Sequence, residues 1–175
     1  MEVGLVDRLP DLDPITADCL RSAGWHRGRR VDVSVAIRSL ESQGYVAGRT
    51  IVSFLESLWG LRLDPANEEG PNFINGEPFI VDPVGVGRRH RDEADEIYSA
   101  IGGSWFPIGW WLSYSHVFMD QSGALVAFAD GLIWRIGDNL LDGLRFMVQA
   151  DRPLMCIHAP EGRKPWPAAT DFSAD

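Results

Sequence analysis

The chain has 175 residues, of which 45% are hydrophobic and 23% charged, and its formal net charge is -9 at pH 7. This length allows one domain with a sizeable core and leaves no room for a second domain of ordinary size, and the composition is that of a globular protein. The negative charge repels the phosphates of nucleic acids and anionic lipid headgroups, which argues against both as direct partners, whereas it attracts a basic protein.

The N-terminal stretch and the cysteines bear on the cellular compartment. Residues 1–10 include Glu2 and Asp7 and lack the basic start and apolar stretch of a signal peptide. No run in the chain approaches the roughly 18 to 20 apolar residues needed to cross a bilayer. Cys19 and Cys156 lie far apart in the sequence, and we interpret both as reduced core residues. We therefore expect a cytoplasmic protein without a membrane segment.

The first third of the chain has helical periodicity. Asp13 followed by Pro14 is a helix-start signal, because aspartate caps free amide groups and proline fits the first helical position, and Gly24 is the expected stop. Asp32 is expected to cap a second helix with apolar residues at helical spacing. A third helix is predicted at residues 50–59.

The composition changes after the third helix. Residues 61–63 and 79–81 resemble short strands, and residues 64–76 between them collect Pro, Asn, Glu and Gly, which is typical of an exposed acidic loop. Residues 85–87 resemble the start of a dinucleotide-binding loop, but the third glycine is missing, so we predict a plain turn. Residues 88–101 predict an exposed amphipathic helix.

The period then becomes extended, and a last helix is predicted at residues 139–149. The turn-type sequences at 120–123 and 130–131 favour antiparallel hairpins, so a meander is the simplest topology. The expected strands are residues 106–111, 114–119, 124–128 and 132–134.

Helices followed by antiparallel strands and a final helix indicate an α+β fold. We assign residues 1–152 to one domain. Residues 153–175 are rich in Pro and Ala and are read as a C-terminal tail, in which residues 154–157 add an edge strand.

No pattern in the chain predicts catalysis, a cofactor or a metal. The paired carboxylates Glu68-Glu69 and Asp95-Glu96 stand in polar surroundings typical of a solvated face. No phosphate-binding loop or nucleophile elbow is present. None of the four histidines has another ligand at a recognised metal-binding spacing; they are His26, His90, His116 and His158.

The chain has seven tryptophans, two of them adjacent. Neighbouring residues of a strand point to opposite faces, so one of Trp110 and Trp111 is expected to point outward, where it either anchors a partner or is covered by a helix. In the basic stretch at residues 26–30, Arg29 or Arg30 is expected to pair with a local carboxylate.

Four segments together resemble the SUKH-3 immunity proteins, a family within the SUKH superfamily. The match runs over roughly residues 12–150, and the segments are AGWHRGRRVD at 23–32, FLESLWGL at 54–61, FPIG at 106–109 and FMDQSG at 118–123. Trp59 stands where the family commonly has glycine, and the chain after Arg152 has no counterpart. The positions carried over as fold-defining are Gly24, Trp25, Arg29, Gly60, Pro107, Gly109 and Gly123.

The resemblance implies a central antiparallel, curved sheet with packed helices. It also implies a bacterial immunity protein of a polymorphic toxin system, which binds and neutralises a cognate toxin of nuclease or deaminase type and has no chemistry of its own. A regulatory scaffold of the same fold with an endogenous partner is the alternative, and a small enzyme with a pocket on the sheet is a third hypothesis. A deep pocket with a buried carboxylate or histidine would favour the enzyme.

Under the leading hypothesis, an acidic surface meets a basic toxin, with charge guiding the encounter and an aromatic anchor prolonging it. The predicted partner-binding residues are Asp64, Glu68, Glu69, Glu77 and one of Trp110 and Trp111.

Overall fold

The computed structural model describes residues 11–168. Residues 1–10, for which we predicted no signal peptide, lie outside the described residues. Among the described residues the helices are α1 (Pro14–Ser22), α2 (Ser34–Glu41), α3 (Arg49–Leu58), α4 (Pro83–Gly87), α5 (Arg91–Ile101) and α6 (Leu140–Gln149). The strands are β1 (Arg62–Leu63), β2 (Phe79–Ile80), β3 (Phe106–Trp111), β4 (Ser115–Met119), β5 (Leu125–Ala129), β6 (Leu132–Gly137) and β7 (Met155–His158).

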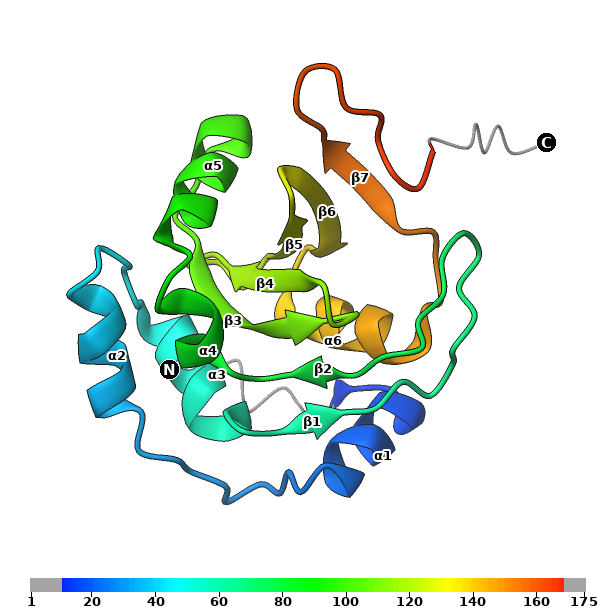
Figure 1. Cartoon of the computed structure of the whole chain (residues 1–175). Coiled ribbons are helices and arrows are strands. Elements are labelled where there is room, and N and C mark those ends of the chain that lie inside the picture. The colour runs from blue at the N-terminus through cyan, green and yellow to red at the C-terminus, as the bar shows by residue number, and fades with distance from the viewer. Residues whose placement is uncertain (1–10, 169–175) are drawn as a thin grey trace.

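The seven strands form a single antiparallel sheet whose spatial order is their order in the chain (Figure 1). This meander confirms the predicted α+β class and topology. Its turns follow from local chemistry: Gly123 and Gly131 adopt positive φ values of 94° and 81°, which glycine reaches without the steric penalty of a side chain.

Helices cover the sheet and make its central strands inaccessible. In Figure 1, α6 lies behind the strands, and it packs against β6 and also against α1, while α4 packs against β3 and α2. Every residue of β4 is buried. Double-sided burial explains why β3 to β5 are mostly apolar and do not alternate, whereas β7 at the sheet edge alternates in burial.

Two local predictions were wrong. Residues 85–87 belong to helix α4, because the Asp82 carboxylate accepts a hydrogen bond from the Gly85 amide at 2.9 Å and Pro83 occupies the first turn. Asp32 does not cap α2 directly: Val33 holds the cap position, and the Asp32 carboxylate instead accepts from the Ser34 amide at 2.9 Å.

The resemblance motif at residues 23–32 fastens the connection between α1 and α2 to the C-terminal end of α3. The Arg29 guanidinium donates to the carbonyl oxygens of Ser57 and Trp59 at 2.6 and 2.7 Å, and the Trp25 indole donates to the Ser57 hydroxyl at 2.9 Å. A cation at free helix-terminal carbonyls is favourable because these carry partial negative charge. Arg30 forms the expected pair with a carboxylate, that of Glu56.

The predicted edge strand after Leu154 is present as β7, which pairs with β6. Leu154 itself is buried, and the Trp134 ring lies edge-on to the Trp166 ring further along. The chain beyond Arg152 therefore contacts the sheet through β7 and again at Trp166, while residues 161–166 are exposed. Among residues 11–168, no helix has both the length and the apolar character needed to span a membrane.

Candidate functional site

The connection between β1 and β2, residues 64–78, is called the acidic loop below. It carries Asp64, Glu68, Glu69 and Glu77, all four of which are exposed. In Figure 1 it extends beyond the sheet and passes the chain segment that leads from α6 to β7. The structure thus presents the four predicted carboxylates on one hairpin loop.

Asparagine side chains hold the acidic loop against the C-terminal end of α6. The Asn75 amide is buried and donates to the Met147 carbonyl at 2.9 Å, and the Asn67 amide donates to the Gln149 carbonyl at 3.1 Å. The backbone amide of Ala66 donates to the Val148 carbonyl at 2.8 Å. These donors satisfy carbonyls that a helix end leaves free, so the loop and the helix stabilise each other.

The far side of the loop is fastened as well. Asn72 makes two hydrogen bonds with the backbone of Leu154, accepting from its amide at 2.8 Å and donating to its carbonyl at 3.1 Å. Phe73 is buried, with its ring 5.7 Å from Trp111 and 5.6 Å from Phe146 between centroids. The loop is therefore fastened on both sides, and a fastened loop loses less conformational entropy in any binding event than a free one does.

Three of the four carboxylates of the loop, Glu68, Glu69 and Glu77, have no ion-pair partner within residues 11–168. Asp64 is neutralised locally by Arg62 at 2.9 Å, and Glu77 accepts a hydrogen bond from the Ser113 hydroxyl. Within residues 11–168, neither Glu68 nor Glu69 takes part in an ion pair. Together with Glu77, which likewise has no ion pair there, they carry the negative charge of the loop that no cation offsets.

Ile74 adds an apolar group to this acidic surface. It forms an isolated β-bridge with Glu69, and 70% of its surface is exposed between the buried Phe73 and Asn75. Exposure of Ile74 was not predictable from the sequence, because a single isoleucine in a polar loop belongs to no periodic pattern that would indicate whether its side chain is buried.

The tryptophan pair separates as strand geometry requires. Trp111 is buried at 1% exposure against Phe73 and Phe146, so it is unavailable to a partner, and its inclusion among the candidate contacts is corrected on this ground. Trp110 points to the other face and is half-buried, with its ring edge-on to His116 at 4.4 Å between centroids. Only Trp110 remains a candidate contact.

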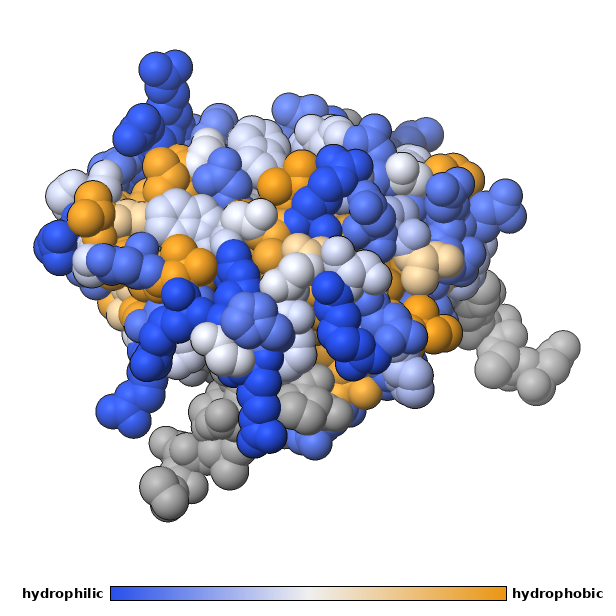
Figure 2. Space-filling model, turned by 90° about the horizontal axis from the view of Figure 1, so that it is seen from below, coloured by the Kyte–Doolittle hydropathy of each residue, from blue (hydrophilic) through white to orange (hydrophobic). Residues whose placement is uncertain are grey.

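The face of the molecule seen in Figure 2 has no large apolar area. Apolar side chains appear there as small separate patches among hydrophilic ones. Such a surface is suited to partners recognised through charge with few apolar anchors.

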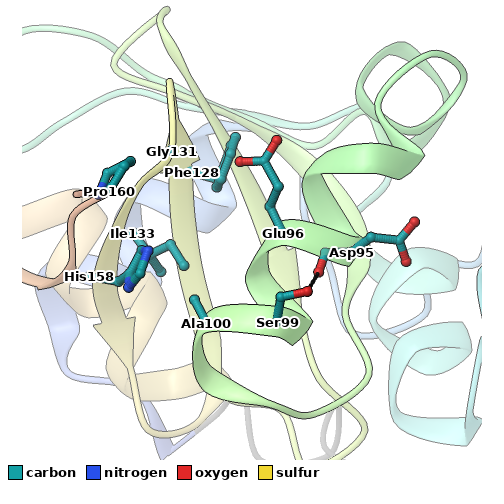
Figure 3. A pocket seen from close by; sticks show the side chains of 9 residues that line it. All are labelled: Asp95, Glu96, Ser99, Ala100, Phe128, Gly131, Ile133, His158 and Pro160. Atoms are coloured by element: carbon teal, nitrogen blue, oxygen red, sulfur yellow. Dashed lines mark hydrogen bonds between the residues drawn. The ribbon is translucent and has the colours of Figure 1, made fainter. Parts of the chain in front are cut away.

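A hollow of about 400 Å³ lies between α5, the β5–β6 hairpin and the end of β7 (Figure 3). Its carboxylates, Asp95 and Glu96, are both exposed, and Asp95 pairs with Arg91 at 2.7 Å. Both carboxylates of this hollow are solvated, and His158 at its edge is half-buried, whereas the enzyme hypothesis requires a deep pocket with a buried carboxylate or histidine. The lining residues are Asp95, Glu96, Ser99, Ala100, Phe128, Gly131, Ile133, His158 and Pro160.

Cys19 flanks the start of the acidic loop, where its thiol donates to the Asp64 carbonyl at 3.2 Å. Burial, with a smaller contribution from the negative charge of Asp64, raises the pKa of the Cys19 thiol to about 11. A raised pKa disfavours the thiolate, which is the form of cysteine that acts as a nucleophile or metal ligand.

The spacing along the sequence indicated that the histidines are isolated from other metal ligands, and for two of them this prediction was wrong. The fold brings His90, the residue before α5, and Glu93 on α5 beside His116 on β4, with one potential ligand atom from each within 4.8 Å of the others. Spacing along the chain did not reveal this group, because His116 lies on a different element from the other two.

A family model described as SUKH-3 immunity protein matches residues 12–150 of the chain. No curated protein and no solved structure matches the chain.

Proposed function

We propose that this chain, which belongs to the SUKH-3 immunity protein family, carries out its immunity role by binding and neutralising a cognate bacterial toxin in the cytoplasm, without catalysing a reaction. The toxin is a basic protein of the nuclease or deaminase type, and it binds at the acidic loop. The observation that carries this proposal is the preorganised loop itself, with unpaired Glu68 and Glu69 beside exposed Ile74.

In this proposal, charge speeds association and an apolar contact slows dissociation. Glu68 and Glu69 steer a basic surface toward the loop, an effect that salt screens over a Debye length of about 8 Å at physiological ionic strength. Ile74 enters an apolar depression on the toxin and slows dissociation. A nuclease or deaminase needs a positive surface to bind nucleic acid, so an acidic loop in that place blocks the substrate by competition.

The test uses candidate toxins encoded near the gene for this chain, and it measures association kinetics over a series of salt concentrations. Glu68→Arg/Glu69→Arg should lower the association rate constant about tenfold at low salt and flatten its salt dependence. Ile74→Ser should raise the dissociation rate constant and leave association nearly unchanged. Loss of growth rescue in cells that express the toxin should follow the loss of affinity.

A matched control reverses two exposed carboxylates on other elements, Glu41 at the end of α2 and Glu96 on α5. Glu41→Arg/Glu96→Arg changes the net charge equally. If it slowed association as much as the loop variant, net charge and not the loop would guide the encounter, and the site would be wrong. If the chain gave no protection against the toxin of its own locus but bound an endogenous protein, the regulatory scaffold would replace the immunity proposal.

A further inference from the structure

Two histidines and a glutamate from different elements converge beneath the start of α5. His90 precedes the first turn of α5, Glu93 lies within that turn, and His116 belongs to the neighbouring strand β4. Glu93 Oε1 lies 3.2 Å from His90 Nδ1, and Glu93 Oε2 lies 2.5 Å from His116 Nδ1. The two imidazole rings are 4.5 Å apart between centroids.

The group is held in place by its surroundings. The side chains of His116 and Glu93 are 11% and 15% exposed, and that of His90 is 36% exposed. Trp110 packs edge-on against the His116 ring. Two of the three groups are thus fixed in the packed interior and the third borders solvent, which leaves a path by which an ion enters.

The donor set matches one class of ion. Zinc binds imidazole nitrogen and carboxylate oxygen at about 2.0 to 2.2 Å, which places the ligand atoms of a tetrahedral site about 3.3 Å apart. The donor atoms here, all within 4.8 Å of one another, need only small side-chain movements to reach that arrangement. Calcium and magnesium prefer sites made of oxygen alone.

We propose that His90, Glu93 and His116 form a binding site for a divalent transition metal ion of the zinc class. In the metal-free protein, Glu93 Oε2 is hydrogen-bonded to His116 Nδ1, and Glu93 Oε1 lies 3.2 Å from His90 Nδ1. The ion binds these atoms, and a proton carried by Nδ1 moves to Nε2 or to solvent. Three protein ligands leave a fourth position for water. Since the ligands come from α5 and β4, bound metal joins the helix to the sheet and stabilises the native state.

The experiment titrates the chelator-treated full chain with Zn²⁺ by calorimetry and with Co²⁺ by visible absorbance, which reports coordination geometry. We expect one Zn²⁺ per chain, a tetrahedral Co²⁺ spectrum and a melting temperature that rises with Zn²⁺. His90→Ala changes a partly exposed side chain and is compatible with folding. His90→Ala should weaken Zn²⁺ binding at least about tenfold, because losing a metal ligand costs more affinity than losing a residue that only hydrogen-bonds to a ligand. Glu93→Gln keeps hydrogen bonding but removes a charged ligand, and it should weaken binding likewise.

His26→Ala and His158→Ala are the controls, because these residues lie outside the group. Both variants should bind Zn²⁺ as the unmodified chain does. The proposal is overturned if the unmodified chain binds no Zn²⁺, if its Co²⁺ spectrum is that of an octahedral hydrated ion, or if His90→Ala and His158→Ala weaken binding equally. The readouts involve no toxin, so they are independent of the proposed function.

Discussion

Asp13 receives three hydrogen bonds at the start of α1, from the Thr16 amide at 3.0 Å, the Thr16 hydroxyl at 2.8 Å and the Gln149 amide at 2.7 Å. The last of these comes from α6, so one carboxylate caps a helix and links it to another. Burial raises the pKa of Asp13, but the hydrogen bonds outweigh burial and hold the pKa below its ordinary value of 3.8.

Asp13→Ala should lower the free energy of unfolding at pH 7 by about 1 kcal/mol, as the loss of a helix cap does. Because the pKa of Asp13 is lowered in the folded state, its stabilising effect is present above 3.8 and is lost as the pH falls through the folded value. The gap between variant and parent in denaturant unfolding should therefore narrow in acid. Asp18→Ala, an exposed control on the same helix, should change stability by less than about 0.5 kcal/mol. Equal losses in the two variants would contradict the role of the cap.

At the scale of the elements, Gly109 determines how closely β2 approaches β3. A Cβ atom at this position would lie 2.1 Å from the Ile80 carbonyl oxygen, which is backbone and cannot turn away. The strand register also shifts between Pro107 and Gly109, at an irregularity of the pairing with β4. A glycine inside a strand marks this kind of close approach or bulge.

Gly109→Ala should destabilise the protein by about 2 kcal/mol, because the strands must move apart to admit the methyl group. Gly76→Ala is the matched control in the acidic loop, where the added Cβ would meet Ile74 Cγ2 at an ordinary 3.6 Å. Thermal unfolding monitored by circular dichroism compares the stability of the two variants. A larger loss in Gly76→Ala than in Gly109→Ala would show that the β2–β3 spacing does not limit stability.

At the scale of the whole molecule, the C-terminal segment completes the sheet and supports the acidic loop. β7 covers the edge of β6, and buried Leu154, just before it, exchanges two hydrogen bonds with Asn72 of the loop. The candidate interface thus depends on chain segments about 80 residues apart in sequence.

Leu154→Ala should lower the free energy of unfolding by about 3 kcal/mol, since it leaves a cavity among buried side chains. Met155→Ala, one position later, removes a side chain that is 55% exposed and should change stability by less than about 0.5 kcal/mol. Denaturant unfolding of both variants distinguishes a docked segment from a solvated one. A small effect of Leu154→Ala would mean that the segment contributes little to the fold.

Much of the fold was predictable from local patterns. Asp13 before Pro14 placed the start of α1, and the apolar strand segments with their turn residues placed β3 to β6 and their meander. These signals act between residues close in sequence, where backbone geometry and hydrogen bonding are decided locally. The helix α4 was missed because the Asp82 cap and Pro83 competed with a glycine-rich pattern typical of turns.

The sequence alone predicted the candidate site as a loop, because an acidic segment rich in glycine and asparagine between two short strands favours an exposed connection. Only the tertiary structure decided that Asn67, Asn72 and Asn75 fasten this loop, that Trp111 is buried while Ile74 is exposed, and that His90 and His116 meet at Glu93. The physical reason is that each of these outcomes depends on contacts between elements distant in sequence, whose positions follow from packing the whole core and not from any local preference.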